Sequence, residues 1–106
     1  MLKGIPSILP PELLKILMEM GHGDELVIAD GNFPGASLAN RLVRCDGHGV
    51  PVVLDAVLSL MPLDFIVPEP VVLMSSSIGS PEPPVWEEYR KILLRHEPEH
   101  SGIAFM

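Results

Sequence analysis

Apolar side chains recur with helical spacing in three stretches of the chain, and a proline opens each stretch. We predict helices over residues 10–21, 51–61 and 85–96, because apolar positions three and four residues apart form one helix face. Proline is tolerated in a first turn, and Gly21 is expected to end the first helix. The side chains expected to face a core are Leu13, Leu14, Leu17 and Met18, then Val53, Leu54, Val57, Leu58 and Met61, and finally Trp86, Tyr89 and Leu93, with Leu94 as a further candidate.

Short apolar runs between these helices predict strands. Residues 25–29 are interpreted as a buried strand, residues 41–45 as a second, and the valine-rich residues 70–75 as a third. Residues 103–106 resemble the start of a fourth strand, which would leave an exposed edge. Loops rich in glycine, proline and serine are expected over 30–39 and 75–84. Helices alternating with short apolar strands predict an α/β fold arranged as a layered sandwich.

Length and charge narrow the class of protein. The 106 residues are enough for one domain, taken as 1–106. Seven basic against fourteen acidic residues give a net charge of -7, so the chain has no basic stripe to bind nucleic acid or an anionic membrane. No apolar run approaches the ~18 residues of a membrane span, and the N-terminus lacks the apolar stretch of a signal peptide.

Two further features of the composition concern location and assembly. Cys45 is the only cysteine, so no intrachain disulfide can form, which favours a reducing, cytoplasmic location. Hydrophobic residues make up 47% of this small chain, which is more apolar surface than one domain of this size can bury. We therefore expect the chain to self-associate.

The segment from Met20 to Pro34 contains the candidate chemistry. His22 lies between two glycines at the predicted end of the first helix, and an imidazole with an unperturbed pKa of about 6.5 can donate and accept protons near neutral pH. Asp30 follows a predicted strand, and the carboxyl end of a strand is a common position for ligand contacts. The alternatives are that His22 is a surface or capping residue and that Asp30 only starts an Asx-turn.

Other chemistries are less well supported. His22, Asp24 and Asp30 could ligate a metal in principle, but they supply one imidazole and irregularly spaced acids, which argues against a metal site. No Gly-x-Ser-x-Gly elbow and no glycine-rich phosphate loop is present. Arg44 and Asp46 form either a strand-end turn or a structural ion pair.

Five segments together carry a resemblance. In chain order they are Leu2-Lys3-Gly4-Ile5-Pro6 with Pro11-Glu12-Leu13-Leu14, Met20-Gly21-His22-Gly23-Asp24-Glu25, Ala29-Asp30-Gly31-Asn32-Phe33-Pro34, and Arg44-Cys45-Asp46-Gly47. They are similar to the fucose mutarotase family, a relative of the D-ribose pyranases, in order over nearly the whole chain. The resemblance implies an α/β layered sandwich of the ribose pyranase/fucose mutarotase type, assembled into rings or decamers.

The resemblance also implies an activity, the interconversion of the α and β anomers of L-fucopyranose without metal, nucleotide or flavin. The residue matching His22 is the general acid and the one matching Asp30 contacts the sugar. Some members use an acid at the position of Asp64, which otherwise resembles a helix-stop residue. The family is longer, so we expect this chain to lack its C-terminal segment. A D-ribose pyranase activity and a non-catalytic sugar-binding or assembly module are the alternatives.

Overall fold

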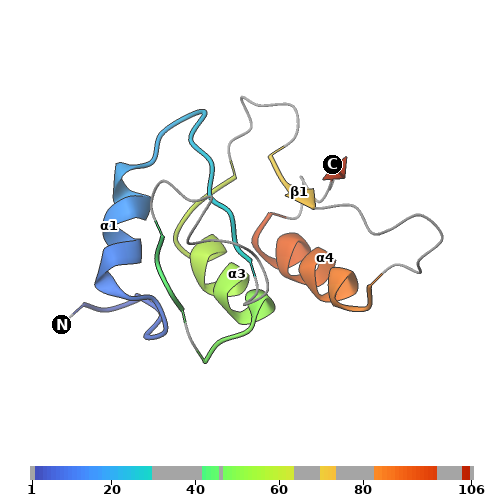
Figure 1. Ribbon diagram of the computed structural model, residues 1–106, viewed down its shortest axis with the longest axis horizontal. Coiled ribbons are helices and arrows are strands. Elements are labelled where there is room, and N and C mark those ends of the chain that lie inside the picture. The colour runs from blue at the N-terminus through green and yellow to red at the C-terminus, as the bar shows by residue number, and fades with distance from the viewer. Residues whose placement is uncertain are drawn as a thin grey trace.

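The computed structural model of this chain describes residues 2–29, 42–45, 47–63, 70–73, 83–97 and 104–105. Within these ranges it forms three helices, α1 (Pro11–Glu19), α3 (Val50–Leu58) and α4 (Val85–His96), and two short strands, β1 (Val72–Leu73) and β2 (Ala104–Phe105). The helices follow one another across the molecule in Figure 1, and the strands lie above α4. The three predicted helices are therefore present.

Helix α1 begins as its sequence predicts but ends differently. Pro10 precedes the helix in an extended conformation, Pro11 occupies the first turn, and Glu12 places a negative charge at the positive end of the helix. The helix ends at Glu19 because Met20 turns to an extended conformation, with φ -72° and ψ 139°. Gly21 is therefore not the left-handed residue that ends the helix. Met18, expected to face the core, is 87% exposed.

Helix α3 is almost wholly apolar and has the most deeply buried face. Gly49 precedes it in an extended conformation and Pro51 lies in its first turn. Its last residue is Leu58, and the Ser59 hydroxyl donates a hydrogen bond of 2.6 Å to the Ala56 carbonyl at this end. The helix thus ends before Met61, the predicted end. Its buried residues are Val53, Ala56, Val57 and Leu58.

Helix α4 has the predicted boundaries, Val85–His96. Glu87 and Glu88 lie in its first turn and Arg95 and His96 in its last, so the charges of both ends complement the helix dipole. Trp86 and Tyr89 are half-buried. Ile92 and Leu93 are buried, whereas Leu94 is 48% exposed. Leu93 therefore faces the core as predicted, and Leu94, the further candidate, does not.

The strand predictions are confirmed only in the C-terminal half of the chain. β1 and β2 pair in parallel, with Val72 opposite Ala104 and Leu73 opposite Phe105, and α4 connects them. Residues 25–29 and 42–45 are not strands, although exposed and half-buried side chains alternate along both. The prediction of a buried strand at 25–29 is wrong, since Val27 is 70% exposed. Alternation of apolar and polar residues predicts which side chains face inward, but a β-strand also needs a neighbouring strand to which its backbone can hydrogen-bond.

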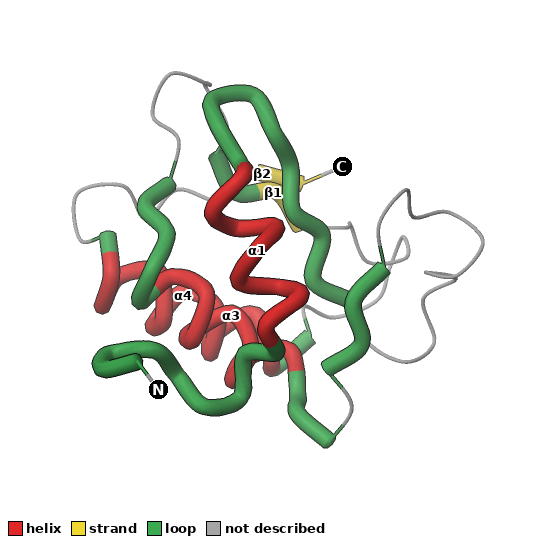
Figure 2. Tube along the Cα trace, turned by 90° about the vertical axis from the view of Figure 1, so that its left-hand side faces the viewer, coloured by secondary structure: helices red, strands yellow, loops and turns green. Residues whose placement is uncertain are grey.

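Two groups of buried side chains form the core. The N-terminal cluster joins Leu9 and Leu13 to Val53, Ala56 and Val57 of α3. The C-terminal cluster joins Leu58 of α3 to Ile92 and Leu93 of α4. Both clusters therefore share α3. When the molecule is turned about the vertical axis, α1 lies in front of α3 and α4 (Figure 2).

Candidate functional site

His22 is held in a tight turn that directly follows α1. The Asp24 N–H donates to the Gly21 carbonyl at 3.1 Å, which closes a four-residue turn. In return the Gly21 N–H donates to the Asp24 carboxylate oxygen Oδ2 at 2.9 Å. Gly23 has a φ of +88°, the left-handed conformation that glycine adopts at the third position of such a turn. The two glycines around His22 therefore have different roles.

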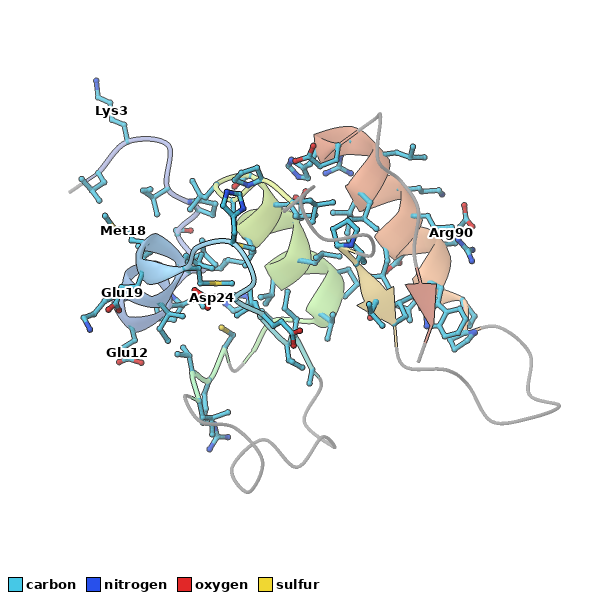
Figure 3. All side chains as sticks on the ribbon, turned by 90° about the horizontal axis from the view of Figure 1, so that it is seen from above. Lys3, Glu12, Met18, Glu19, Asp24 and Arg90 are labelled. Atoms are coloured by element: carbon cyan, nitrogen blue, oxygen red, sulfur yellow. The ribbon has the colours of Figure 1, made fainter. Side chains whose placement is uncertain are left out.

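This turn presents the imidazole of His22 to solvent from a fixed backbone. His22 and its neighbours in the turn are exposed, while Leu26 and Ile28 beyond the turn pack against the N-terminal cluster. Asp24, labelled in Figure 3 beside α1, contributes its carboxylate to the turn itself. The His22 imidazole, a group able to transfer protons, is therefore exposed to small polar molecules. The turn that carries it is fixed by α1 on one side and by the packing of Leu26 and Ile28 on the other.

The other two candidate site residues, Asp30 and Asp64, lie outside the described residues, as does Asp46. The chain directly before Asp64 is described. Met61 packs against the N-terminal cluster and Leu63 against the C-terminal cluster. The Leu63 N–H donates to the Glu97 carboxylate oxygen Oε1 at 3.3 Å. Sequence analysis did not identify Glu97, because nothing in its local sequence reveals a partner 34 positions earlier.

A second polar group links α3 to the end of α4. Arg95 Nη1 donates to Asp55 Oδ1 at 3.0 Å, and His96 Nε2 lies 2.7 Å from the same oxygen, where it donates because a carboxylate only accepts. Asp55 also lines an open pocket of about 350 Å³ between residues 6–8 and α3. No residue of the His22 turn lines this pocket, so the two features are separate.

The described residues contain neither a metal-binding cluster nor a membrane-spanning helix. In these ranges no three side chains among histidine, cysteine, aspartate and glutamate come together as a metal site. Over the same residues, no helix has both the length and the apolar character that a transmembrane helix requires.

Comparison with known proteins identifies the fold. A family model described as the RbsD / FucU transport protein family matches residues 3–105. The chain superimposes with a TM-score of 0.92 on the crystal structure of the fucose mutarotase in complex with L-fucose from Streptococcus pneumoniae, at 47% identity, covering 99% of this chain and 75% of that one. FucU from Bifidobacterium longum gives a TM-score of 0.90, also at 47% identity, over 98% and 76% of the two chains. The predicted type of α/β fold is confirmed by these likenesses.

Sequence relatives agree with this result. The fucose mutarotase of Homo sapiens is 48% identical over 101 residues, which are 89% of this chain and 66% of the human protein. The L-fucose mutarotase of Actinobacillus pleuropneumoniae serotype 5b (strain L20) is 44% identical over 90 residues, 84% of this chain and 62% of that protein. The chain thus spans about two thirds of the length of these relatives. The match to the family model and the likeness to the two structures show that this chain belongs to the RbsD / FucU transport protein family.

Proposed function

We propose that the chain is an L-fucose mutarotase, which interconverts the α and β anomers of L-fucopyranose. The observation that carries the proposal is the turn at Gly21–Asp24, whose reciprocal hydrogen bonds hold His22 in an exposed position. This turn lies in a chain 47% identical to a mutarotase crystallised with L-fucose. The substrate is thus a monosaccharide, and proton transfer is the chemistry required.

Anomer exchange needs two proton movements. The ring oxygen gains a proton and the anomeric hydroxyl gives its proton to water, so the bond between C1 and the ring oxygen breaks and the sugar opens to the aldehyde. Rotation about the C1–C2 bond and reclosure then give the other anomer. In this proposal His22 donates the proton to the ring oxygen. Such general acid catalysis typically contributes about 10²–10⁴-fold. Asp30 and Asp64 accept hydrogen bonds from sugar hydroxyls and thereby fix the orientation of the substrate.

Saturation-transfer proton NMR of the L-fucose anomeric signals tests this function directly. We expect exchange between the α and β signals to increase in proportion to the concentration of the chain. The variant His22→Ala should lose most of this exchange, by about 10²-fold or more, and keep its circular dichroism spectrum. His48→Ala removes another exposed histidine and is the matched control. Full exchange in His22→Ala would refute the role of His22, and no exchange by the parent chain would refute the activity.

The same assay separates the two alternatives. D-Ribose, tested beside L-fucose, would identify a pyranase if it exchanged faster. Calorimetry with L-fucose would identify a sugar-binding module if the sugar bound without exchange.

We further propose that the chain self-associates and acts in the cytoplasm. Large apolar side chains are exposed on several segments, among them Leu2, Met18 and Val27. Burial of such side chains between copies of the chain would remove their apolar surface from water and stabilise an interface. Sedimentation velocity should therefore give a mass above the 11.5 kDa of one chain, and a species of 11.5 kDa at all concentrations would contradict the proposal. Fractionation of cells that express the chain tests the cytoplasmic location.

A further inference from the structure

The backbone amide of Gly21 has its acceptor outside α1. In a continuing helix the Gly21 N–H would donate to the Leu17 carbonyl, four residues earlier. The Met20 N–H takes that carbonyl instead, at 3.3 Å, and Met20 turns to an extended conformation. The Gly21 N–H donates to the Asp24 carboxylate oxygen Oδ2 at 2.9 Å. Asp24 therefore supplies the acceptor that the helix does not offer to this amide.

Asp24 bonds both backbone groups of Gly21. Its own N–H donates to the Gly21 carbonyl at 3.1 Å, while its carboxylate accepts the Gly21 N–H. The two bonds run in opposite directions between the same two residues, so they close a ring that contains His22 and Gly23. One bond would close the turn, and the second also fixes the direction in which the chain enters it. Because His22 directly follows Gly21, this direction determines where its side chain begins.

Hydrogen bonds inside the turn are a principal support of its shape. All four residues from Gly21 to Asp24 are exposed. In the part of the chain that the structure describes, a methyl group at Gly21 or Gly23 would meet no heavy atom within 4 Å, the glycine and its chain neighbours excepted. Leu26, two residues beyond the turn, packs against the N-terminal cluster. The turn is thus joined to packed structure at its ends, and its own shape depends on the bonds within it.

The charge at the end of α1 gives no other reason for an acid at this position. The C-terminal end of a helix carries partial negative charge, and the last turn of α1 contains Glu19 and no basic residue. A carboxylate beyond this end therefore gains nothing from the helix dipole. A hydrogen bond from an amide to an ionised carboxylate is roughly twice as strong as one between neutral groups. The contact that the Asp24 carboxylate favours is thus the bond from Gly21.

We propose that Asp24 is a positioning residue for His22. Its carboxylate holds the Gly21 amide, which fixes the turn and thereby the position of the His22 imidazole relative to the sugar. This inference rests on the proposed function, in which His22 protonates the ring oxygen. Asp24 acts through the backbone and not on the substrate, so it is not a catalytic residue. Its removal lowers the rate of proton transfer and leaves sugar binding unchanged.

Hydrogen exchange measured by NMR tests the contact. In Asp24→Ala the Gly21 amide should exchange about 2- to 10-fold faster than in the parent chain, because its acceptor is lost. Asp24→Asn keeps an acceptor oxygen at the same place and should restore most of the protection. The control Glu25→Ala removes the neighbouring exposed carboxylate, which lies outside the turn. Equal exchange of the Gly21 amide in Asp24→Ala and the parent chain would overturn the proposal.

L-Fucose kinetics test the function of the contact. Asp24→Ala should lower kcat about 3- to 10-fold, with KM and the calorimetric Kd within about twofold of the parent chain, because a misplaced general acid affects the transition state and not binding. Asp24→Asn and Glu25→Ala should keep kcat within about twofold. The Cε1–H resonance of His22 should shift in Asp24→Ala and return in Asp24→Asn. Urea denaturation gives the folded fraction of each variant, and kcat is expressed per folded chain.

The outcomes separate this inference from the function on which it rests. A parent chain that does not exchange L-fucose would overturn both. A parent chain that exchanges L-fucose, with kcat unchanged in Asp24→Ala, would overturn the inference alone. So would a loss of kcat that Asp24→Asn does not restore, or a raised Kd in place of a lowered kcat. Loss of kcat at constant Kd, together with rescue by Asp24→Asn, would establish the positioning role.

Discussion

Gly23 is the residue on which the shape of the His22 turn depends. Its φ of +88° lies in the left-handed region, where a Cβ atom costs about 1–2 kcal/mol. Gly21, on the other side of His22, does not have a positive φ. Among the described residues, a Cβ atom at either glycine would have no heavy atom within 4 Å apart from those of the glycine and its two chain neighbours. The backbone conformation alone therefore distinguishes the two positions.

Alanine substitution should reveal this difference. We expect Gly23→Ala to lower the free energy of unfolding by about 1 kcal/mol and to slow L-fucose exchange, because the strained turn would present His22 in another geometry. Gly21→Ala, the matched control, should cost less than half as much. Urea denaturation and saturation-transfer NMR measure the two effects. Equal losses at both glycines would show that the left-handed conformation is not what holds the turn.

At the scale of single residues, the local sequence predicted part of the candidate site. The sequence predicted that His22 lies between two glycines at the end of the first helix, but it assigned the helix end to Gly21 and did not indicate that Gly23 adopts the positive φ. That choice depends on the helix ending at Glu19 and on the bond between Asp24 and Gly21. Asp55, His96 and Glu97 were not predicted, because their partners are 34 to 41 positions away. No pattern along the chain encodes contacts of that range.

At the scale of single elements, α4 shows which features the sequence determines. Its acidic first turn and basic last turn are local signals, and the observed boundaries match the predicted ones. The segments 25–29 and 42–45 show the opposite case. Their side chains alternate as a strand would require, but strand formation depends on a neighbour that is distant in the sequence. Helix prediction therefore succeeded for α4, whereas strand prediction failed for these two segments.

Adjacent leucines in α4 allow a direct test of its packing. Leu93 is 1% exposed and Leu94 is 48% exposed. Leu93→Ala should lower the free energy of unfolding by about 2–5 kcal/mol, because it leaves a cavity beneath the helix. Leu94→Ala, with the same change of side chain, should cost at most about 0.5 kcal/mol in the absence of a partner on that face. Chemical denaturation of both variants makes the comparison, and similar losses would contradict the assigned inward face.

At the scale of the whole molecule, α3 is the element that the two clusters share. Val53, Ala56 and Val57 pack in the N-terminal cluster, and Leu58 packs in the C-terminal cluster. Neither cluster can lose its packing without exposing one side of the same helix. The single domain over 1–106 stays a prediction, and we expect the two clusters to unfold together because they share this helix.

The single tryptophan makes this cooperativity measurable. Trp86 lies in α4, the helix that contributes Ile92 and Leu93 to the C-terminal cluster, so its fluorescence reports on that half. We expect the fluorescence transition and the far-ultraviolet circular dichroism transition to coincide in urea. Val57→Ala, in the N-terminal cluster, should shift both midpoints equally, with a loss of about 1–3 kcal/mol. A fluorescence midpoint that did not move would show that the clusters unfold independently.

The parallel pairing of β1 with β2 has a consequence for the newly made chain. Val72 pairs with Ala104, so the first strand must wait for residues made 32 positions later (104 − 72). At synthesis rates of about 5–20 residues per second, that wait lasts roughly 2–6 s. During this interval Val72 and Leu73 form an apolar strand without its partner, which is the kind of segment that chaperones bind. Ribosome pauses within residues 74–103 would lengthen this exposure.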